Sequence, residues 1–141
     1  IVAEWRRLGG DAAAGPGDAL TPAVPFAGYT LQCFARACLK LVGAQPERVP
    51  LGELVRLGDA GLRPVGAGEV AIGARFAEFW QTNGGEAQFG PPISPELQRG
   101  DRVVQYTRYA RLEQRPDGSI ALGRLGDEYM RLPGGVPYRW P

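Results

Sequence analysis

Apolar residues recur along the chain with two different spacings, and the first spacing predicts short amphipathic helices. In ARFAEFWQTN, Phe76, Phe79 and Trp80 stand at positions i, i+3 and i+4, so their side chains share one helix face. Ile1 and Trp5 occupy the corresponding places near the start of the chain. Aromatic side chains at helical spacing usually face a core, and we expect these side chains to do so.

The second spacing is the alternation of a β-strand. DRVVQYTRYARLEQR (residues 101–115) alternates and is rich in β-branched and aromatic residues, which predicts a strand or a tight hairpin. RPDGS (residues 115–119) then predicts a turn with Pro116 at its second position. IALGRLGDEYMRL (residues 120–132) predicts a short strand that leads into a helix. These elements together predict an α+β fold.

Glycine and proline residues separate the predicted elements. Asn83, Gly84 and Gly85 follow the predicted helix, and a glycine just past a helix end takes the left-handed conformation without steric cost. FGPPISPE (residues 89–96) is predicted to be extended, because each proline fixes its own φ and biases the residue before it away from the helix. A phosphate-binding loop needs its glycines before a helix N-terminus, whereas this double glycine follows a helix. We therefore interpret the glycines as structural.

The chain repeats itself with a period of roughly 70 residues, which is the signature of a duplicated supersecondary unit. WRRLGGDAAAGP (residues 5–16) aligns without gaps on WQTNGGEAQFGP (residues 80–91). After small gaps, LQCFARACLK (residues 31–40) aligns on VQYTRYARLE (residues 104–113). The positions predicted to be structural in this pattern are Trp5, Trp80, Gly9, Gly10, Gly84, Gly85, Gly90 and Pro91.

The repeat sets the expected organisation of the chain. LGEL at residues 51–54 aligns on LGRL at residues 122–125, late in each copy. We expect two tandem copies of a short helix, a Gly/Pro loop and a β-hairpin, packed as one compact repeat domain. The predicted segments are an eroded first copy (residues 1–57), an inter-repeat linker (58–69), a second copy (70–131), and a proline-rich tail or start of a third copy (132–141).

Composition narrows the class of protein. With 141 residues, 44% of them hydrophobic, the chain can bury one modest core. The net charge of +1, with both signs mixed throughout, gives no polyanion-binding surface, so nucleic acid is not an expected partner. No apolar run approaches the roughly 20 residues of a membrane span. The chain opens on Ile1 inside an apolar pattern, so we expect a mature or partial chain from a longer precursor.

The sequence offers few groups for catalysis. It contains no histidine, which excludes Ser-His-Asp and Cys-His catalysis and every histidine-containing metal site. Glu78, Glu86 and Glu113 are carboxylates that could form an acid–base pair, but nothing in the sequence fixes their separation. We therefore expect a protein that is not an enzyme and that binds no metal and no cofactor.

The two cysteines, Cys33 and Cys38, leave two alternatives open. In one continuous strand, residues five apart lie roughly 17 Å apart and point to opposite faces. A disulfide needs Cα atoms within about 7 Å, so a bridge requires a sharp bend at residues 35–37, as in a hairpin. In the other alternative, the two side chains are small buried apolar groups.

The series WQTNGG, FGPPIS, VQYTRYARLE and LGRLG within residues 70–129 resembles the LGFP type of tandem repeat and similar repeats of secreted bacterial proteins. The first copy matches less well, because CFARAC replaces the aromatic strand and Ala14 stands where the pattern has an aromatic residue or leucine. The resemblance implies a non-catalytic, exported module that ties proteins to the cell envelope. It assigns no ligand-binding residue to this chain.

The expected function is that of an extracellular, cell-surface module that attaches to the cell envelope or to surface polysaccharide. Aromatic rings and planar guanidinium groups suit the CH faces and hydroxyls of glycans. The candidate ligand-binding residues are therefore Tyr106, Tyr109, Arg108, Arg111 and Gln105. The alternative for these residues is a strand with one buried and one solvated side.

A second function class stays open. Open-ended repeats expose unsatisfied terminal faces, which favour contact with further copies of the chain. The alternative function is therefore a self-assembling structural subunit of a bacterial surface layer or filament. The expected partners are cell-wall or surface polysaccharide and further copies of the chain itself.

Overall fold

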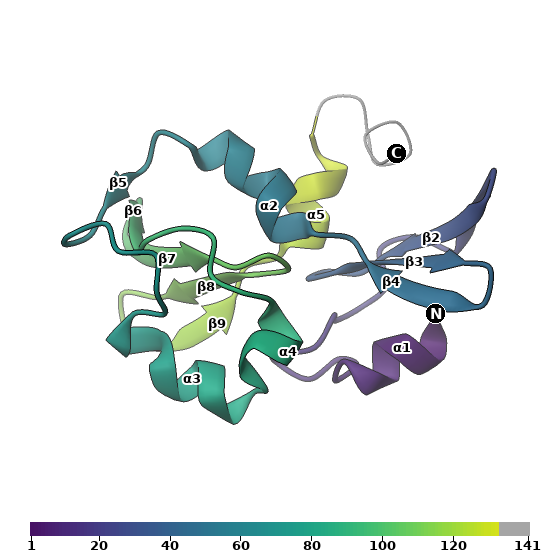
Figure 1. Ribbon diagram of the computed structural model, residues 1–141, viewed down its shortest axis with the longest axis horizontal. Coiled ribbons are helices and arrows are strands. Elements are labelled where there is room, and N and C mark those ends of the chain that lie inside the picture. Colours follow the sequence, from purple (N-terminus) through teal and green to yellow (C-terminus); the bar gives the residue numbers. More distant parts are fainter. Residues whose placement is uncertain (133–141) are drawn as a thin grey trace. The chain divides into compact units, whose positions relative to one another are not determined.

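The computed structural model, which describes residues 1–132, contains both helices and antiparallel strands (Figure 1). This confirms the predicted α+β class. The chain divides into two units: unit 1 is Ile1–Leu51 with Arg124–Pro141, and unit 2 is Gly52–Gly123. The predicted tail lies outside the described residues from residue 133 onward.

Unit 1 is built on a four-stranded antiparallel sheet whose strands are neighbours in chain order, β1-β2-β3-β4. Its core contains Leu8, Phe34 and Leu39, with Ile1 and Trp5 packed against them. The predicted core role of Trp5 is therefore met only in part, since its indole is half-buried. The elements of this unit are α1 (Val2–Arg7), β1 (Val24–Phe26), β2 (Tyr29–Cys33), β3 (Cys38–Val42), β4 (Gln45–Arg48) and α5 (Leu125–Met130).

Unit 2 is built on a five-stranded antiparallel sheet in the order β5-β6-β7-β8-β9. The predicted hairpin of residues 101–115 is confirmed as β7 and β8, and the predicted strand and helix of residues 120–132 are confirmed as β9 and α5. The elements are α2 (Leu51–Arg56, with Leu51 in unit 1), η1 (Leu57–Asp59), β5 (Arg63–Pro64), η2 (Ala74–Phe76), α3 (Ala77–Thr82), α4 (Gly85–Phe89), β6 (Leu97–Arg99), β7 (Arg102–Tyr106), β8 (Arg111–Gln114) and β9 (Ile120–Leu122).

Aromatic side chains hold the helices of unit 2 to its interior. Phe76 and Phe89 are fully buried. Phe79 and Trp80 are half-buried, and their rings lie 5.9 Å and 5.5 Å from the ring of Phe89. The predicted helix face is therefore correct, although only Phe76 of the three aromatic residues in that pattern is completely enclosed.

A double glycine follows α1 in unit 1 and α3 in unit 2. Gly9 and Gly10 have φ angles of 109° and 56°, and Gly84 and Gly85 have φ angles of 103° and 56°. Such backbone is unfavourable for any residue with a Cβ atom. The predicted helix stop at residue 84 is confirmed. The next helix, α4, has only five residues, which are too few to show a helical pattern in the sequence.

In the structure, Gly90 corresponds to Gly17 and not to Gly15. The predicted ungapped alignment is therefore displaced by two residues after the double glycine. Both glycines have positive φ angles, 76° and 83°. A Cβ atom on Gly90 would lie 2.7 Å from that of Arg108, and one on Gly17 would lie 3.1 Å from that of Ala35. Both glycines thus lie under the same position of a hairpin turn. The predicted match of residues 15–16 with residues 90–91 is wrong, because the loop in unit 1 is longer.

The helix that follows each sheet along the chain packs in the other unit, and we call this arrangement the helix exchange. α2 follows β4 of unit 1 along the chain, yet it packs in unit 2, where the Glu53 N–H group donates to the Arg108 carbonyl oxygen at 3.3 Å. α5 follows β9 of unit 2 and packs in unit 1, where the Gly126 N–H group donates to the Ala35 carbonyl oxygen at 3.0 Å. Each unit is therefore completed by the helix that follows the other unit's sheet.

A glycine in each exchanged helix permits this close contact. A Cβ atom on Gly52 would lie 1.8 Å from the Thr107 carbonyl oxygen, and one on Gly126 would lie 1.7 Å from the Phe34 carbonyl oxygen. No side chain fits at either position. LGEL at residues 51–54 therefore corresponds to LGDE at residues 125–128, and the predicted match with LGRL is wrong by three residues.

The predicted linker spans residues 58–69, and its residues 63–64 form a strand of the sheet of unit 2. β5 pairs antiparallel with β6, and the Val65 N–H group then donates to the Glu96 carbonyl oxygen at 2.8 Å. The chain continues to residues 71–73, which lie against Gln105. The segment between the two sheets is thus a structural part of unit 2.

Candidate functional site

The five predicted ligand-binding residues lie in two different environments of unit 2. Gln105, Tyr106 and Arg111 are buried, with at most 2% of each side chain exposed. Arg108 is exposed and Tyr109 is half-buried in the turn between β7 and β8. The Arg108 guanidinium carbon lies 5.4 Å from the centre of the Tyr109 ring. The structure thus presents this pair at the surface and places the other three side chains in the interior; ligand binding by the five stays a prediction.

Tyr106 and Arg111 form a cross-strand pair between β7 and β8. Arg111 Nη1 donates a hydrogen bond to the Tyr106 hydroxyl at 3.2 Å, and the hydroxyl donates to the carboxylate of Asp59. Burial raises the pKa of Tyr106 to about 12; the hydrogen bond to Asp59 acts in the same direction, while Arg111 opposes it. The phenol is therefore protonated at neutral pH and serves as a hydrogen-bond donor.

Three arginines hold two carboxylates around this pair. Glu113 Oε2 accepts a bond from Arg111 Nε at 2.7 Å, and its Oε1 accepts one from Arg102 Nη1 at 2.8 Å. Asp59 Oδ2 accepts a bond from Arg99 Nε at 3.1 Å. Buried charges are tolerated when they are paired and hydrogen-bonded in this way. Glu113, one of the carboxylates considered for acid–base chemistry, thus makes two ion pairs inside the unit.

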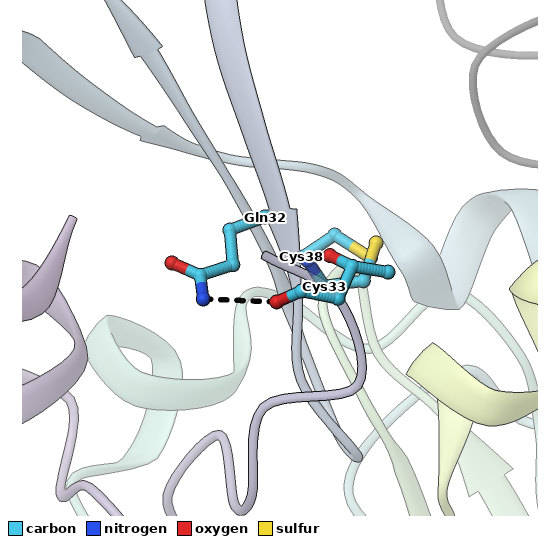
Figure 2. The surroundings of a disulfide bond; sticks show 4 residues. Gln32, Cys33 and Cys38 are labelled. Carbon is cyan, nitrogen blue, oxygen red and sulfur yellow. Dashed lines mark hydrogen bonds between the residues drawn. A yellow bond between two sulfur atoms is a disulfide. The ribbon is translucent and has the colours of Figure 1, made fainter. Parts of the chain in front are cut away.

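A disulfide occupies the equivalent cross-strand pair in unit 1. Cys33 and Cys38 face each other across β2 and β3, with Cα atoms 4.1 Å apart, and their sulfur atoms are bonded (Figure 2). The hairpin turn between them supplies the bend that a bridge requires. Of the two alternatives that the sequence left open, the structure has the disulfide.

Gln105 holds a segment of the chain that lies outside the sheet. Its Nε2 group donates to the carbonyl oxygens of Ala71 at 2.7 Å and Ser94 at 3.0 Å, and its Oε1 accepts from the Gly73 N–H group at 3.0 Å. The side chain thus satisfies one backbone acceptor and one backbone donor of residues 71–73. This explains why a glutamine stands at a buried position, which the sequence pattern alone did not show.

An open pocket of about 430 Å³ lies on the surface of unit 2 beside α3, and no motif in the sequence indicates it. Its lining includes the carboxylate of Glu78, the hydroxyl of Thr82, the amide of Asn83 and the half-buried ring of Phe79. Asn83 Nδ2 donates to the Phe79 carbonyl oxygen at 2.8 Å, which fixes the orientation of the amide. Hydrogen-bonding groups around an aromatic side chain suit a ligand that has both hydroxyls and CH groups.

The guanidinium group of Arg75, which lines this pocket, is also held in a fixed position. Arg75 lines the pocket, forms an ion pair with Glu96 and donates from Nη1 to Gln114 Oε1 at 2.8 Å. These bonds hold the guanidinium group at the pocket edge. Glu78, which the sequence placed on a solvent face, is exposed as predicted.

Comparison of the chain with protein-family models, with curated proteins and with solved structures found no match. Residues 1–132 contain no cluster of three or more His, Cys, Asp or Glu side chains placed to hold a metal ion. Among the helices of these residues, none combines the length and the apolar character needed to cross a membrane.

Proposed function

We propose that this protein is an exported, non-catalytic module that attaches to the cell envelope by binding surface polysaccharide in the pocket of unit 2. The open pocket beside α3 carries the proposal. It combines a half-buried phenylalanine ring with a carboxylate, a hydroxyl, an amide and a fixed guanidinium group. Sugar rings present hydroxyls around their edges and CH groups on their faces, so this set of groups is complementary to them.

Export is supported by the disulfide in unit 1. Disulfides form and persist in oxidising compartments outside the cytoplasm, and they are rare in reduced cytosol. Cys33 and Cys38 are bonded to each other, and both side chains are completely buried. The bond is thus a structural element of a hairpin, which favours an extracellular or cell-surface location for the protein.

The test is co-sedimentation of the purified chain with isolated cell-wall material, beside a wall-free control. The double variant Glu78→Ala/Thr82→Ala removes two polar groups of the pocket. We expect it to bind walls at least about tenfold more weakly, which corresponds to a loss of about 1.4 kcal/mol of binding free energy. The matched control is Gln81→Ala/Glu86→Ala, which removes exposed polar side chains of α3 and α4 outside the pocket lining. Equal binding by both variants would contradict the proposal.

The alternative function, a self-assembling structural subunit, has one observation in its favour. Each unit is completed by a helix that enters it from the other unit's sheet. The same contacts made between two chains would link them, as in domain swapping. Pelleting of the chain without walls, together with sedimentation coefficients that increase with protein concentration, would favour assembly over polysaccharide binding.

A further inference from the structure

We infer, on the basis of the proposed function, that the polysaccharide bound in the pocket beside α3 carries free amino groups and that the carboxylate of Glu78 pairs with one of them. The ligand thus contains amino sugars whose nitrogen is not acetylated. Two features of the pocket support this class of sugar: the balance of its charges and the kind of hydrogen-bonding atoms that its lining leaves open. Both features select a group that is positively charged and donates hydrogen bonds.

The charges of the pocket lining are those of Arg75 and Glu78. The charge of Arg75 is balanced, because its Nε atom forms an ion pair with the carboxylate of Glu96. Its Nη1 atom donates to Gln114 Oε1 at 2.8 Å, which holds the guanidinium group beside that pair. Glu78 is exposed, and within residues 1–132 its side chain takes part in no ion pair and no hydrogen bond. The pocket therefore presents one unbalanced negative charge to a ligand, which favours a cation.

The polar atoms beside Glu78 are mainly acceptors. Asn83 Nδ2 donates to the Phe79 carbonyl oxygen at 2.8 Å, so its Oδ1 atom is the part of the amide left for a ligand. The carboxylate of Glu78 only accepts, and the hydroxyl of Thr82 accepts or donates. An ammonium group has three donors and no acceptor, so it matches these atoms. An acetylated nitrogen has one donor, brings a carbonyl acceptor of its own and carries no charge.

The apolar part of the lining suits the same ligand. Phe79 and Ile120 are half-buried and line the pocket, and they can contact the CH groups of a sugar ring. An aromatic ring also attracts a cation that lies over its face. An acidic sugar, by contrast, would bring its carboxylate to Glu78, while Arg75 is already paired with Glu96. The pocket therefore favours an amino sugar over a uronic acid.

The test compares two soluble tetrasaccharides in NMR titrations of the full ¹⁵N-labelled chain at about pH 6, where amines are protonated. One is a tetramer of glucosamine, and the other is its fully N-acetylated form. We expect saturable shifts of the amides of Thr82 and Asn83, with the glucosamine tetramer binding at least about threefold more tightly. This preference should decrease as salt is added, because salt screens the attraction between exposed charges.

A matched pair of variants assigns the preference to one carboxylate. Glu78→Gln removes the charge and keeps the size of the side chain, so it should abolish the preference for the glucosamine tetramer. Glu86→Gln makes the same change at an exposed position of α4 outside the pocket lining, and it should keep the preference. Both side chains are exposed, so we expect neither substitution to affect folding.

Co-sedimentation separates this inference from the proposed function. Isolated walls are treated with acetic anhydride, which converts free amines into amides, and we expect them to pellet less of the chain than untreated walls. Equal pelleting by treated and untreated walls would overturn the inference and leave the proposed function standing. An absence of pelleting with either kind of wall would contradict both.

Three results of the titrations would also overturn the inference. The first is equal affinity for the two tetramers, or no saturable shift with either of them. The second is a preference that Glu78→Gln retains, which would place the recognition of the amine elsewhere. The third is an equal affinity and the same shifts with Nα-acetyl-lysine amide, which would identify the amine of a peptide, and not that of a sugar, as the group that binds.

Discussion

The same cross-strand pair is joined by a covalent bond in one unit and by a hydrogen bond within a buried ionic network in the other. In unit 1, Cys33 and Cys38 are linked by a disulfide across the hairpin. In unit 2, Tyr106 and Arg111 occupy that place and connect to Glu113. A disulfide stabilises chiefly by restricting the unfolded chain, whereas a buried ionic network must offset the cost of removing its charges from water. The two hairpins should therefore differ in their response to substitution, reduction and pH.

The largest loss of stability is expected from breaking the ion pair between Arg111 and Glu113. Arg111→Met leaves the buried carboxylate of Glu113 with Arg102 alone, and removal of one partner of a buried ion pair costs about 3–5 kcal/mol. The control is Arg115→Met at an exposed arginine just after β8, which should change stability by less than about 0.5 kcal/mol. Both free energies of unfolding come from chemical denaturation.

A double variant sharpens this prediction. Arg111→Met combined with Glu113→Leu removes both charges, so no buried carboxylate is left without its Arg111 partner. We expect the double variant to be more stable than Arg111→Met alone. A double variant as unstable as the sum of the two single variants would indicate that packing, rather than charge, dominates at this position.

The disulfide should have a smaller effect. Cys33→Ala combined with Cys38→Ala opens a short loop, with a sequence separation of 5, for which chain entropy gives about 2 kcal/mol. Thermal unfolding with and without a reducing agent provides the measurement. The reducing agent should lower the unfolding temperature of the natural chain and leave that of the double variant unchanged; an equal shift of both proteins would contradict the prediction.

Substitution of the double glycines should lower the stability of both units in the same way. Gly10 and Gly85 both have a φ of 56° and lie against a tryptophan ring, so Gly10→Val and Gly85→Val should each cost more than about 1 kcal/mol. Gly61→Val is the control, because no atom lies near its Cβ position and its φ is not positive. An unchanged denaturation midpoint in Gly85→Val would rule out the helix-end interpretation.

The smallest effect appears only in alkaline solution. The pKa of Tyr106 is raised by burial from 10.0 to about 12, so its contribution to stability is complete below pH 10 and is lost as the pH rises from 10 toward 12. Tyr106→Phe should abolish this part of the pH dependence. Tyr29→Phe in unit 1 should not, and urea denaturation of the three proteins at pH 9, 10 and 11 provides the comparison.

Local sequence signals predicted the elements well, because their causes are local. The double glycine after ARFAEFWQTN marks a real helix end, and the RPDGS turn is closed by a bond from the Gly118 N–H group to the Arg115 carbonyl oxygen. The β7–β8 hairpin and the strand–helix of residues 120–132 follow from residue type and spacing in the same way. Each of these signals lies within a few residues of the structure that it determines.

Long-range contacts explain what the sequence did not reveal. Alternation in β7 left open a strand with one solvated side, but Gln105 is covered by residues 71–73 and Tyr106 by Asp59, so both faces are buried. The exchange of helices depends on contacts between distant segments and has only one local trace. That trace is the leucine–glycine–acidic step at Gly52 and Gly126, where a carbonyl oxygen occupies the space of a side chain. The pocket beside α3 is formed by side chains from helix, turn and strand, so no motif reveals it.

The helix exchange has a consequence for the order of folding. Unit 2 is one continuous segment, Gly52–Gly123, whereas unit 1 combines the first residues of the chain with α5 near its end. A chain made from its N-terminus therefore contains all of unit 2 before the last helix of unit 1 exists. We expect β1–β4, although they are made before unit 2, to reach their native packing after it. A chain truncated just after residue 123 should protect the amides of β7 and β8 from hydrogen exchange more strongly than those of β2 and β3.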